Sequence, residues 1–202
     1  MSPEVLLIFL KAPRPGTVKT RLAGTIGPEA AVGIYRELVT TTLEQVSRLD
    51  SVVLCFAPDD AGPEIEPWVR PGWVMEPQGD GDLGTRLTRA VNAAFDRGVV
   101  RLVILGSDCP WQTAGDVRAA WKELETSDVV LGPAEDGGYW LIGLRAPSVS
   151  LFRNIPWSQP TVLRETLDRI REAGLSHKLL RTLPDVDTEG DWLRWRMSGA
   201  RA

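Results

Sequence analysis

Short apolar runs alternate along the chain with longer amphipathic segments. The short runs are rich in Val, Ile and Leu and predict buried strands at 5–10, 51–57, 73–77, 101–107, 128–134 and 139–144, with another near 177–183. The amphipathic segments predict helices at about 28–48, 84–97, 113–126 and 160–173, and a last helix that begins within 185–195. Pro28 suits a first helical turn and Thr188 an N-cap, whereas 58–67 has the composition of a loop.

This alternation of strands and helices predicts the fold class. It indicates an α/β fold with a mostly parallel sheet, and without a linker or an internal repeat the 202 residues are expected to form a single domain, 1–202. In open α/β sheets, ligands bind beyond the carboxyl ends of the strands. The loops after 5–10, before Gly84 and after Gly106 are therefore expected to converge on one ligand site.

Charge and composition exclude several classes of function. The net charge of −4 is unfavourable for nonspecific nucleic-acid binding. Cys55 and Cys109 lack the spacing of a zinc motif, so neither a disulfide framework nor a zinc site is expected. The apolar run 5–10 is too short to span a bilayer, and no targeting segment is recognisable. These features predict a soluble, cytoplasmic protein without a membrane or nucleic-acid partner.

The basic segment KAPRPGTVKTRL, residues 11–22, follows the first predicted strand, and we call it the basic loop. Its position favours phosphate binding, but it is not a Walker A loop, because the required glycines are replaced by Pro13 and Val18. Proline also lacks the backbone N–H that such loops use. Lys19 and Arg21 can instead present side-chain cations to a polyphosphate. The alternative is a solvated surface turn.

Three aspartates follow predicted strands or precede a helix. Asp108 comes directly after the strongest strand, and Asp185 and Asp187 are spaced to lie on one side of an extended segment. Together they would form an all-oxygen site for a hard cation such as Mg²⁺ that also bridges phosphates. The alternative for Asp108 and Asp187 is helix capping.

Further candidates are distributed over two glycine-rich segments. QGDGDLGTR (78–86) predicts a flexible loop in which Gly84 and Arg86 begin a helix near a ligand. Asp136-Gly137-Gly138 predicts a tight turn between two strands. Trp140 and Trp157 are candidates for stacking against a ring. His177 is the only histidine, which argues against a Ser-His-Asp or Cys-His hydrolase.

Five segments resemble, in order, successive motifs of one bacterial family. KAPRPGTVKTRL, QGDGDLGTRL, LGSDCP, VVLGPAEDGGYWLIGL and DVDTEGDW resemble the DUF2064 family, a group of GT-A-fold, nucleotide-diphospho-sugar transferase-like proteins. The family is more distantly similar to the molybdenum-cofactor, phospholactate and phosphoenolpyruvate guanylyltransferases. The resemblance implies a GT-A-like three-layer α/β sandwich with a mostly parallel central sheet.

The resemblance also implies roles for individual residues. Nucleotide phosphates would be held by the basic loop and the glycine-rich loop, through Lys11, Arg14, Gly16, Lys19, Thr20, Arg21, Gly84 and Arg86. The metal, Mg²⁺ or Mn²⁺, would be held by Asp108, Asp185 and Asp187. The acceptor would contact Gly137, Gly138, Tyr139 and Trp157. Tyr139 stands where the guanylyltransferases have a threonine, which argues against a phospholactate-type acceptor.

The expected function is a Mg²⁺-dependent transferase that uses a nucleotide-activated donor and a small-molecule acceptor. Lys19, Arg21, Asp108 and Asp136 are the candidate catalytic residues, with Asp136 as a general base. The family description favours glycosyl transfer from a nucleotide sugar. The cationic loop favours the alternative, nucleotidyl transfer with release of pyrophosphate. A second alternative is a non-catalytic nucleotide-binding protein.

Overall fold

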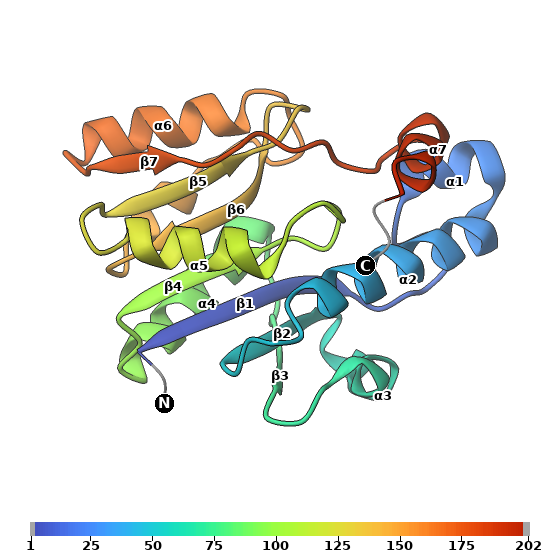
Figure 1. Cartoon of the computed structure of the whole chain (residues 1–202), viewed down its shortest axis with the longest axis horizontal. Helices are drawn as coiled ribbons and strands as arrows, with labels where there is room; N and C mark the ends of the chain where they lie inside the picture. Colours follow the sequence, from blue (N-terminus) through green and yellow to red (C-terminus); the bar gives the residue numbers. More distant parts are fainter. Residues whose placement is uncertain (1–2, 200–202) are drawn as a thin grey trace.

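A seven-stranded sheet forms the centre of the computed structural model, which describes residues 3–199 (Figure 1). The strands are ordered β3-β2-β1-β4-β6-β5-β7, and β6 alone runs antiparallel to its two neighbours. Their bounds are β1 (Glu4–Lys11), β2 (Val52–Ala57), β3 (Val74–Pro77), β4 (Arg101–Leu105), β5 (Val129–Pro133), β6 (Tyr139–Leu144) and β7 (His177–Leu179). The expected mostly parallel sheet is confirmed.

Helices cover both faces of the sheet and give three layers. One hydrophobic cluster joins the sheet to α2 (Pro28–Gln45), α3 (Gly62–Ile65) and α5 (Ala114–Glu123). A second joins the opposite face to α4 (Leu83–Asp96) and α6 (Val162–Glu172). Alternate residues of a strand point to opposite faces, so the continuous apolar runs predicted as strands supply both clusters. The expected α/β three-layer sandwich is confirmed.

A smaller cluster lies beyond the end of the sheet. It joins α1 (Thr20–Ile26) and α7 (Glu189–Met197) to α2 through Leu22, Val186 and Trp195, which are almost fully buried. Figure 1 shows α1 and α7 packed together at this end of the molecule. The α1–α7 lobe, as we call these two helices, thus forms one side of the region beyond the strand ends.

The secondary structure differs from the prediction in two places. Residues 20–26 form helix α1, although no helix was predicted there. A seven-residue helix has little stability of its own, and α1 depends on burial of Leu22 in the lobe, a tertiary contact. Residues 58–67, predicted as loop, instead contain α3 and the short 3₁₀ turn Asp59–Ala61, and a second 3₁₀ turn, Glu66–Trp68, begins at their end.

Within residues 3–199, no helix combines the length and the apolar character needed to cross a membrane. The longest described helix, α2, has a polar outer face. Cys55 and Cys109 are both buried, with free thiols. The cytoplasmic location stays a prediction.

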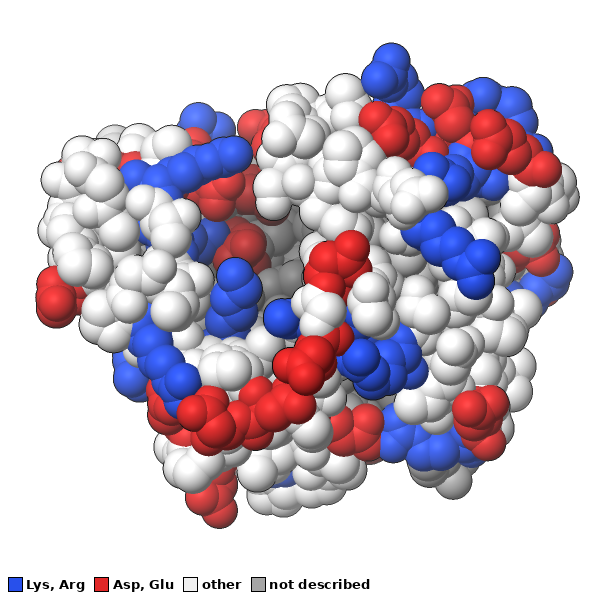
Figure 2. All heavy atoms as spheres, turned by 180° about the vertical axis from the view of Figure 1, so that it is seen from behind, with Lys and Arg blue, Asp and Glu red and all other residues white. Residues whose placement is uncertain are grey.

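The topology brings four segments to one edge of the sheet. β1, β4 and β5 all end there, and because β6 is antiparallel, the β5–β6 turn lies at the same edge. The chain after β7 continues along β5, where Ala134 pairs with Leu183. Figure 2 shows a hollow in the molecular surface beside the α1–α7 lobe, with basic and acidic side chains gathered around it.

Candidate active site

The basic loop enters the site directly from β1. Gly16 has a φ of 77°, and the backbone N–H of Thr17 donates to the carbonyl of Arg14, so the loop turns sharply there. Lys19 follows in the left-handed region, at φ 47° and ψ 47°, as the N-cap of α1. This conformation is unusual for a residue with a side chain and costs about 1–2 kcal/mol.

Lys19 is the centre of the polar network at the site. Its side chain is only 3% exposed, and its Nζ lies 2.8 Å from Asp108 Oδ1 and 3.3 Å from Asp187 Oδ1. Burial disfavours the charged ammonium, but the attraction of Asp108 and then Asp187 outweighs it, so the pKa of Lys19 is raised. Lys19 therefore stays protonated in this environment.

The three predicted carboxylates come together from two segments. Asp108 lies just beyond β4, and Asp185 and Asp187 flank Val186, whose side chain is fully buried in the α1–α7 lobe. In an extended segment, burial of Val186 directs both neighbours to the opposite side. The Val186 N–H also donates to the carbonyl oxygen of Asp108 at 3.1 Å, which joins the two segments.

Asp185 shows how much negative charge the site concentrates. Burial first, and then the nearby carboxylates of Asp136 and Asp108, raise the pKa of Asp185 to about 7, although Lys19 opposes the shift. The carboxylates of Asp108, Asp136 and Asp187 thus each lie close enough to Asp185 to disfavour its charged form.

The alternative of helix capping is excluded for Asp108 and Asp187. Thr113 caps α5 in a capping box with Asp116, and Thr188 caps α7 in a capping box with Asp191. Thr188 was predicted as this N-cap, which is confirmed. Asp108 and Asp187 are therefore free for another role.

The chemistry of this donor set suits a hard cation, because every donor is a carboxylate oxygen. In this structure, however, no three Asp, Glu, His or Cys side chains within residues 3–199 are arranged to hold a metal ion. The Lys19 ammonium instead occupies the space between Asp108 and Asp187. The metal role of the three aspartates stays a prediction.

The other members of the basic loop have different environments. Arg21 is 66% exposed, and its Nη1 donates to Asp187 Oδ2 at 3.2 Å. Thr20 is the exposed first residue of α1, and the Lys11 side chain is exposed at the end of β1. Gly16 shapes the turn rather than presenting a side chain. The cationic end of the loop at the site is thus made by Lys19 and Arg21.

Arg14 is paired with carboxylates of α3 and of the turn before it. Its guanidinium pairs with Glu64 of α3, with Nη2 2.6 Å from Oε1, and with Asp60 at 3.1 Å. Hydrogen bonds to these carboxylates, Glu64 first, raise the pKa of Arg14. In this arrangement Arg14 fastens the basic loop to α3, and its supporting role in phosphate binding stays a prediction.

The β5–β6 turn has the predicted form. Asp136 Oδ1 accepts from the Gly138 N–H at 2.8 Å, and Gly137 has a φ of 91°. Gly137 also lies so close to the Pro160 carbonyl that a Cβ would sit 2.1 Å from its oxygen. Asp136 remains exposed beside the other carboxylates, so the structure leaves it available for an acceptor.

The aromatic residues predicted near the acceptor belong largely to the core. Tyr139 lies against the second hydrophobic cluster with its hydroxyl buried, and its ring packs edge-on against Trp157, with centroids 6.4 Å apart. Trp140 is 3% exposed, and its Nε1 donates to the carbonyl of Arg181. Ring stacking on Trp140 was thus a wrong expectation, because its ring is buried in the core. Tyr139 is half-buried, and its acceptor role stays a prediction. Trp157 is partly buried, and its acceptor role stays a prediction.

Gly84 also serves packing. It is buried in the first turn of α4, where a Cβ would sit 2.4 Å from the Phe152 carbonyl oxygen and 3.1 Å from Trp157 Nε1. Phe152 and Trp157 lie against Gly84, and the nucleotide contact predicted for it stays a prediction. Arg86 is half-buried nearby, with an Nε that has no hydrogen-bond partner among the described residues, and its phosphate role stays a prediction.

Sequence reasoning missed two residues that support the site. The Tyr35 hydroxyl accepts from the Lys11 N–H at 2.8 Å and lies 3.4 Å from Ser107 Oγ, beside Asp108. Gln78 is buried, and its Nε2 donates to the carbonyls of Leu10 and Cys55, which links the ends of β1 and β2. Tyr35 stands in a largely apolar helical stretch and Gln78 opens the glycine-rich segment 78–86, and neither setting signals these contacts.

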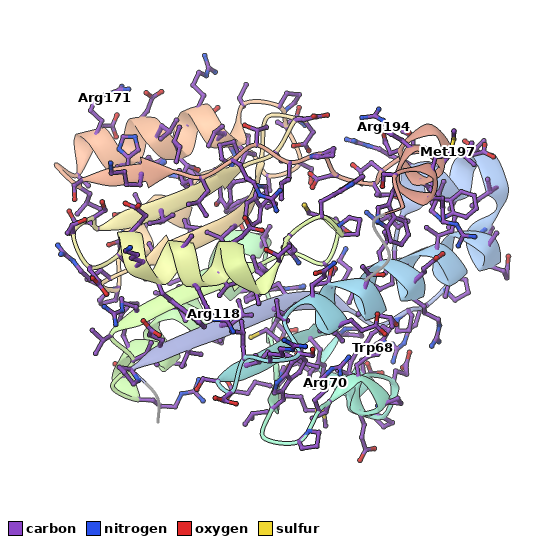
Figure 3. All side chains as sticks on the ribbon, viewed as in Figure 1. Trp68, Arg70, Arg118, Arg171, Arg194 and Met197 are labelled. Atoms are coloured by element: carbon purple, nitrogen blue, oxygen red, sulfur yellow. The ribbon has the colours of Figure 1, made fainter. Side chains whose placement is uncertain are left out.

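The α1–α7 lobe presents different surfaces to the two sides. Trp195 is buried against α1, whereas Figure 3 shows Arg194 and Met197 on the outside of α7. Arg171 lies at the opposite end of the molecule, on α6. Arg171 is therefore well separated from the α1–α7 lobe.

Comparisons with known proteins agree with this architecture. Residues 41–159 match the family model DUF2064, described as an uncharacterized protein conserved in bacteria. A solved structure from Desulfovibrio desulfuricans G20, provisionally assigned as a nucleotide-diphospho-sugar transferase, is 36% identical with a TM-score of 0.90; the match covers 98% of this chain and 89% of that one. The family and GT-A-like fold expected from the sequence are confirmed.

Two curated relatives are guanylyltransferases. The 2-phospho-L-lactate guanylyltransferase of Methanothermobacter thermautotrophicus is 29% identical, and the phosphoenolpyruvate guanylyltransferase of Sphaerobacter thermophilus is 32% identical. Each match covers 66% of this chain, but only 59% and 65% of the respective relatives. The chain therefore matches less than two thirds of the length of either relative.

Proposed function

We propose that this chain, which belongs to the DUF2064 family, is a nucleotidyltransferase. It binds a nucleoside triphosphate in the hollow at the carboxyl edge of the sheet and transfers the nucleotidyl group to a small acceptor. The observation that carries the proposal is the buried Lys19 ammonium, held with Arg21 against the carboxylates that follow β4 and precede α7.

The proposed chemistry needs positive charge on the leaving group. An acceptor oxygen attacks the α-phosphorus, the bond to the bridging α–β oxygen breaks, and pyrophosphate leaves with the electron pair of that bond. Lys19 is the N-cap of α1 and Arg21 lies in its first turn, where they stabilise the negative charge that develops on pyrophosphate. Asp108, Asp185 and Asp187 would hold Mg²⁺ or Mn²⁺, which neutralises phosphate charge when it is bound.

The acceptor is proposed to enter beside the β5–β6 turn. Asp136 is exposed there and lies close enough to Asp185 to raise the pKa of that carboxyl group. It is therefore placed to accept the proton of an acceptor hydroxyl. Gly137 and Gly138 give this turn its shape, and Trp157 is a partly buried neighbour of Tyr139 beneath it.

The second candidate is glycosyl transfer from a nucleotide sugar, which leaves a nucleoside diphosphate. The Desulfovibrio desulfuricans neighbour, 36% identical, favours it through its provisional assignment. We rank it second because both curated relatives are guanylyltransferases and because Lys19 and Arg21 suit a pyrophosphate leaving group. This reverses the order expected from the sequence alone. A non-catalytic nucleotide-binding protein would not need four clustered carboxyl groups.

The test combines binding with product analysis. With Mg²⁺ present, the melting temperature is measured against the four nucleoside triphosphates, their diphosphates and a set of nucleotide sugars, because a ligand selective for the native state raises it. The stabilising donor is then incubated with small hydroxy acids and sugars, and the phosphorus NMR spectrum is recorded. Pyrophosphate and a new phosphodiester support nucleotidyl transfer. A nucleoside diphosphate formed from a nucleotide sugar supports glycosyl transfer instead.

A further inference from the structure

The Lys19 ammonium is paired with carboxylate oxygen atoms that a metal ion at this site would also contact. Its Nζ contacts Oδ1 of both Asp108 and Asp187, and Arg21 contacts Oδ2 of Asp187. Both oxygens of Asp187 are therefore already paired with protein cations. A metal ion bound to either oxygen of Asp187 would lie beside one of these cations, and charge repulsion would weaken that pair.

The same carboxylates are open to arriving ligands. The Asp108 side chain is 53% exposed and that of Asp187 is 37% exposed, whereas Lys19 is almost completely covered. Lys19 thus approaches the pair from the protein interior. A cation that comes from the solvent reaches the carboxylates from the other side.

The strained backbone conformation of Lys19 would favour movement of its side chain once the side-chain contacts are lost. Its left-handed φ of 47° lies between the basic loop and α1, a helix that begins without a side-chain cap. Such a conformation persists only while the surrounding contacts hold it, and here the described contacts of the side chain are its two ion pairs. Loss of these pairs would leave the strained conformation held only by the backbone on either side, through buried Val18 and the hydrogen bond from the Ala23 N–H to the Lys19 carbonyl.

We propose that Lys19 is a place-holding cation that exchanges partners during the binding cycle. In the free protein its ammonium neutralises Asp108 and Asp187; when a metal-bound polyphosphate enters, Lys19 leaves these carboxylates and pairs with phosphate oxygens. The proposal rests on the proposed function, because it requires that the aspartates bind a metal. It predicts antagonism between Lys19 and a metal ion alone, and cooperation between Lys19 and the polyphosphate.

The first test uses Mn²⁺ and inorganic tripolyphosphate as probes. Free Mn²⁺ is measured by electron paramagnetic resonance in titrations of the wild type and of Lys19→Met, which removes the charge but keeps a long side chain. Without tripolyphosphate, Lys19→Met is expected to bind Mn²⁺ about tenfold more tightly, because a competing charge is gone. With Mn²⁺ saturating, it is expected to bind tripolyphosphate at least about tenfold more weakly.

The control is Lys178→Met, which changes the net charge equally on the exposed edge strand β7. It is expected to match the wild type in both titrations. Equal or weaker Mn²⁺ binding by Lys19→Met, while the wild type binds Mn²⁺ together with tripolyphosphate, overturns the exchange but leaves the metal site. A wild type that binds no Mn²⁺ with or without tripolyphosphate overturns both the exchange and the proposed metal site.

The second test needs no variant. Reductive methylation of the wild type is followed by mass spectrometry, with the exposed Lys122 and Lys178 as internal references. Mg²⁺ alone is expected to raise the methylation rate of Lys19 several-fold relative to these references, because its ion pairs with the aspartates are weakened. Added tripolyphosphate is expected to lower the rate again. A Lys19 rate that saturating Mg²⁺ leaves unchanged contradicts the exchange.

Discussion

The backbone N–H of Val186 donates a 3.1 Å hydrogen bond to the carbonyl oxygen of Asp108. This bond joins the segment after β4 to the segment before α7, although the two are far apart in the sequence. The side chain of Val186 is buried in the α1–α7 lobe, so packing and hydrogen bonding fix the same short segment. The carboxylates on either side of Val186 are thereby held near Asp108 without any contact between their own side chains.

The hydrogen bond between Val186 and Asp108 is made by backbone atoms, so the substitution Asp108→Asn is expected to preserve it. The substitution keeps the side-chain size but removes one carboxylate from the group around Lys19. We expect Mn²⁺ affinity in the presence of tripolyphosphate to fall at least about tenfold. Circular dichroism is expected to show an unchanged fold.

The matched control for Asp108→Asn is Asp168→Asn. Asp168 pairs with Arg171, which Figure 3 shows on α6, away from the α1–α7 lobe. An exposed pair of this kind contributes little, so metal affinity should not change. Equal affinities for the two variants would show that Asp108 does not bind the metal.

The two arginines of the basic loop are expected to differ in phosphate binding. Arg21 is exposed beside Asp187, whereas Arg14 is held by Glu64 and Asp60. Arg21→Gln is expected to weaken tripolyphosphate binding by about tenfold to a hundredfold, the loss typical of one charge-assisted hydrogen bond. Arg14→Gln is expected to change it by less than about threefold, because this side chain already has carboxylate partners.

Isothermal titration calorimetry with tripolyphosphate in Mg²⁺ buffer measures both arginine variants directly. The two substitutions remove the same charge from the same loop, so each controls for the other. Equal losses would mean that the loop attracts polyphosphate through its overall charge. A larger loss for Arg14→Gln would mean that Arg14 leaves Glu64 when ligand binds.

Asp185 gives the metal-free protein a characteristic pH dependence. Its pKa rises from an ordinary value of 3.8 to about 7 on folding, so between these values the folded state keeps a proton that the unfolded state releases. Because the folded state then binds more protons, the free energy of unfolding falls as pH rises through this window and levels off above it. Charged Asp185 thus destabilises the metal-free fold.

Urea unfolding in the presence of a chelator, from about pH 5 to about pH 8, tests this dependence. Asp185→Asn cannot ionise, so its midpoint is expected to lack this part of the decline and to exceed the wild-type midpoint increasingly toward pH 8. Asp168→Asn again serves as control and should follow the wild type. Parallel profiles for wild type and Asp185→Asn would show that Asp185 is not perturbed.

The sequence predicted the fold well because its strongest signals were local. The continuous apolar runs of β1, β2 and β4 need burial on both faces, which requires helices on both sides of a parallel sheet. Helix α1 was missed because its stability comes from Leu22 packing in the α1–α7 lobe, a contact that no local pattern encodes.

The candidate site was predictable in part for the same reason. Lys19, Asp108 and Asp187 follow strands or precede a capped helix, so topology brings them together. The direction of other side chains was not predictable. The Arg14 side chain pairs with Glu64 of α3, a helix that was itself not predicted. Side chains alternate between the two faces of a strand, and the position of Tyr139 in β6 directs its side chain to the second hydrophobic cluster.

At Gly84 the steric effect of an added Cβ on stability can be distinguished from the effect of helix propensity. In an open helical position, alanine is more favourable than glycine by about 0.5–1 kcal/mol. At Gly84, however, an added Cβ would lie 2.4 Å from the backbone oxygen of Phe152, which cannot swing away as a flexible side chain can. Gly84→Ala is therefore expected to lower the free energy of unfolding by about 1–3 kcal/mol, as overpacking does.

Gly33 is the matched control, because it lies in helix α2 with no atom within 4 Å of an added Cβ. Gly33→Ala is expected to raise the free energy of unfolding by about 0.5–1 kcal/mol, so the same substitution should have opposite signs at the two sites. Urea unfolding measures both. If Gly84→Ala were also stabilising, the segment after Phe152 would have to move away from α4, and the placement of Trp157 beside the proposed acceptor site would be wrong.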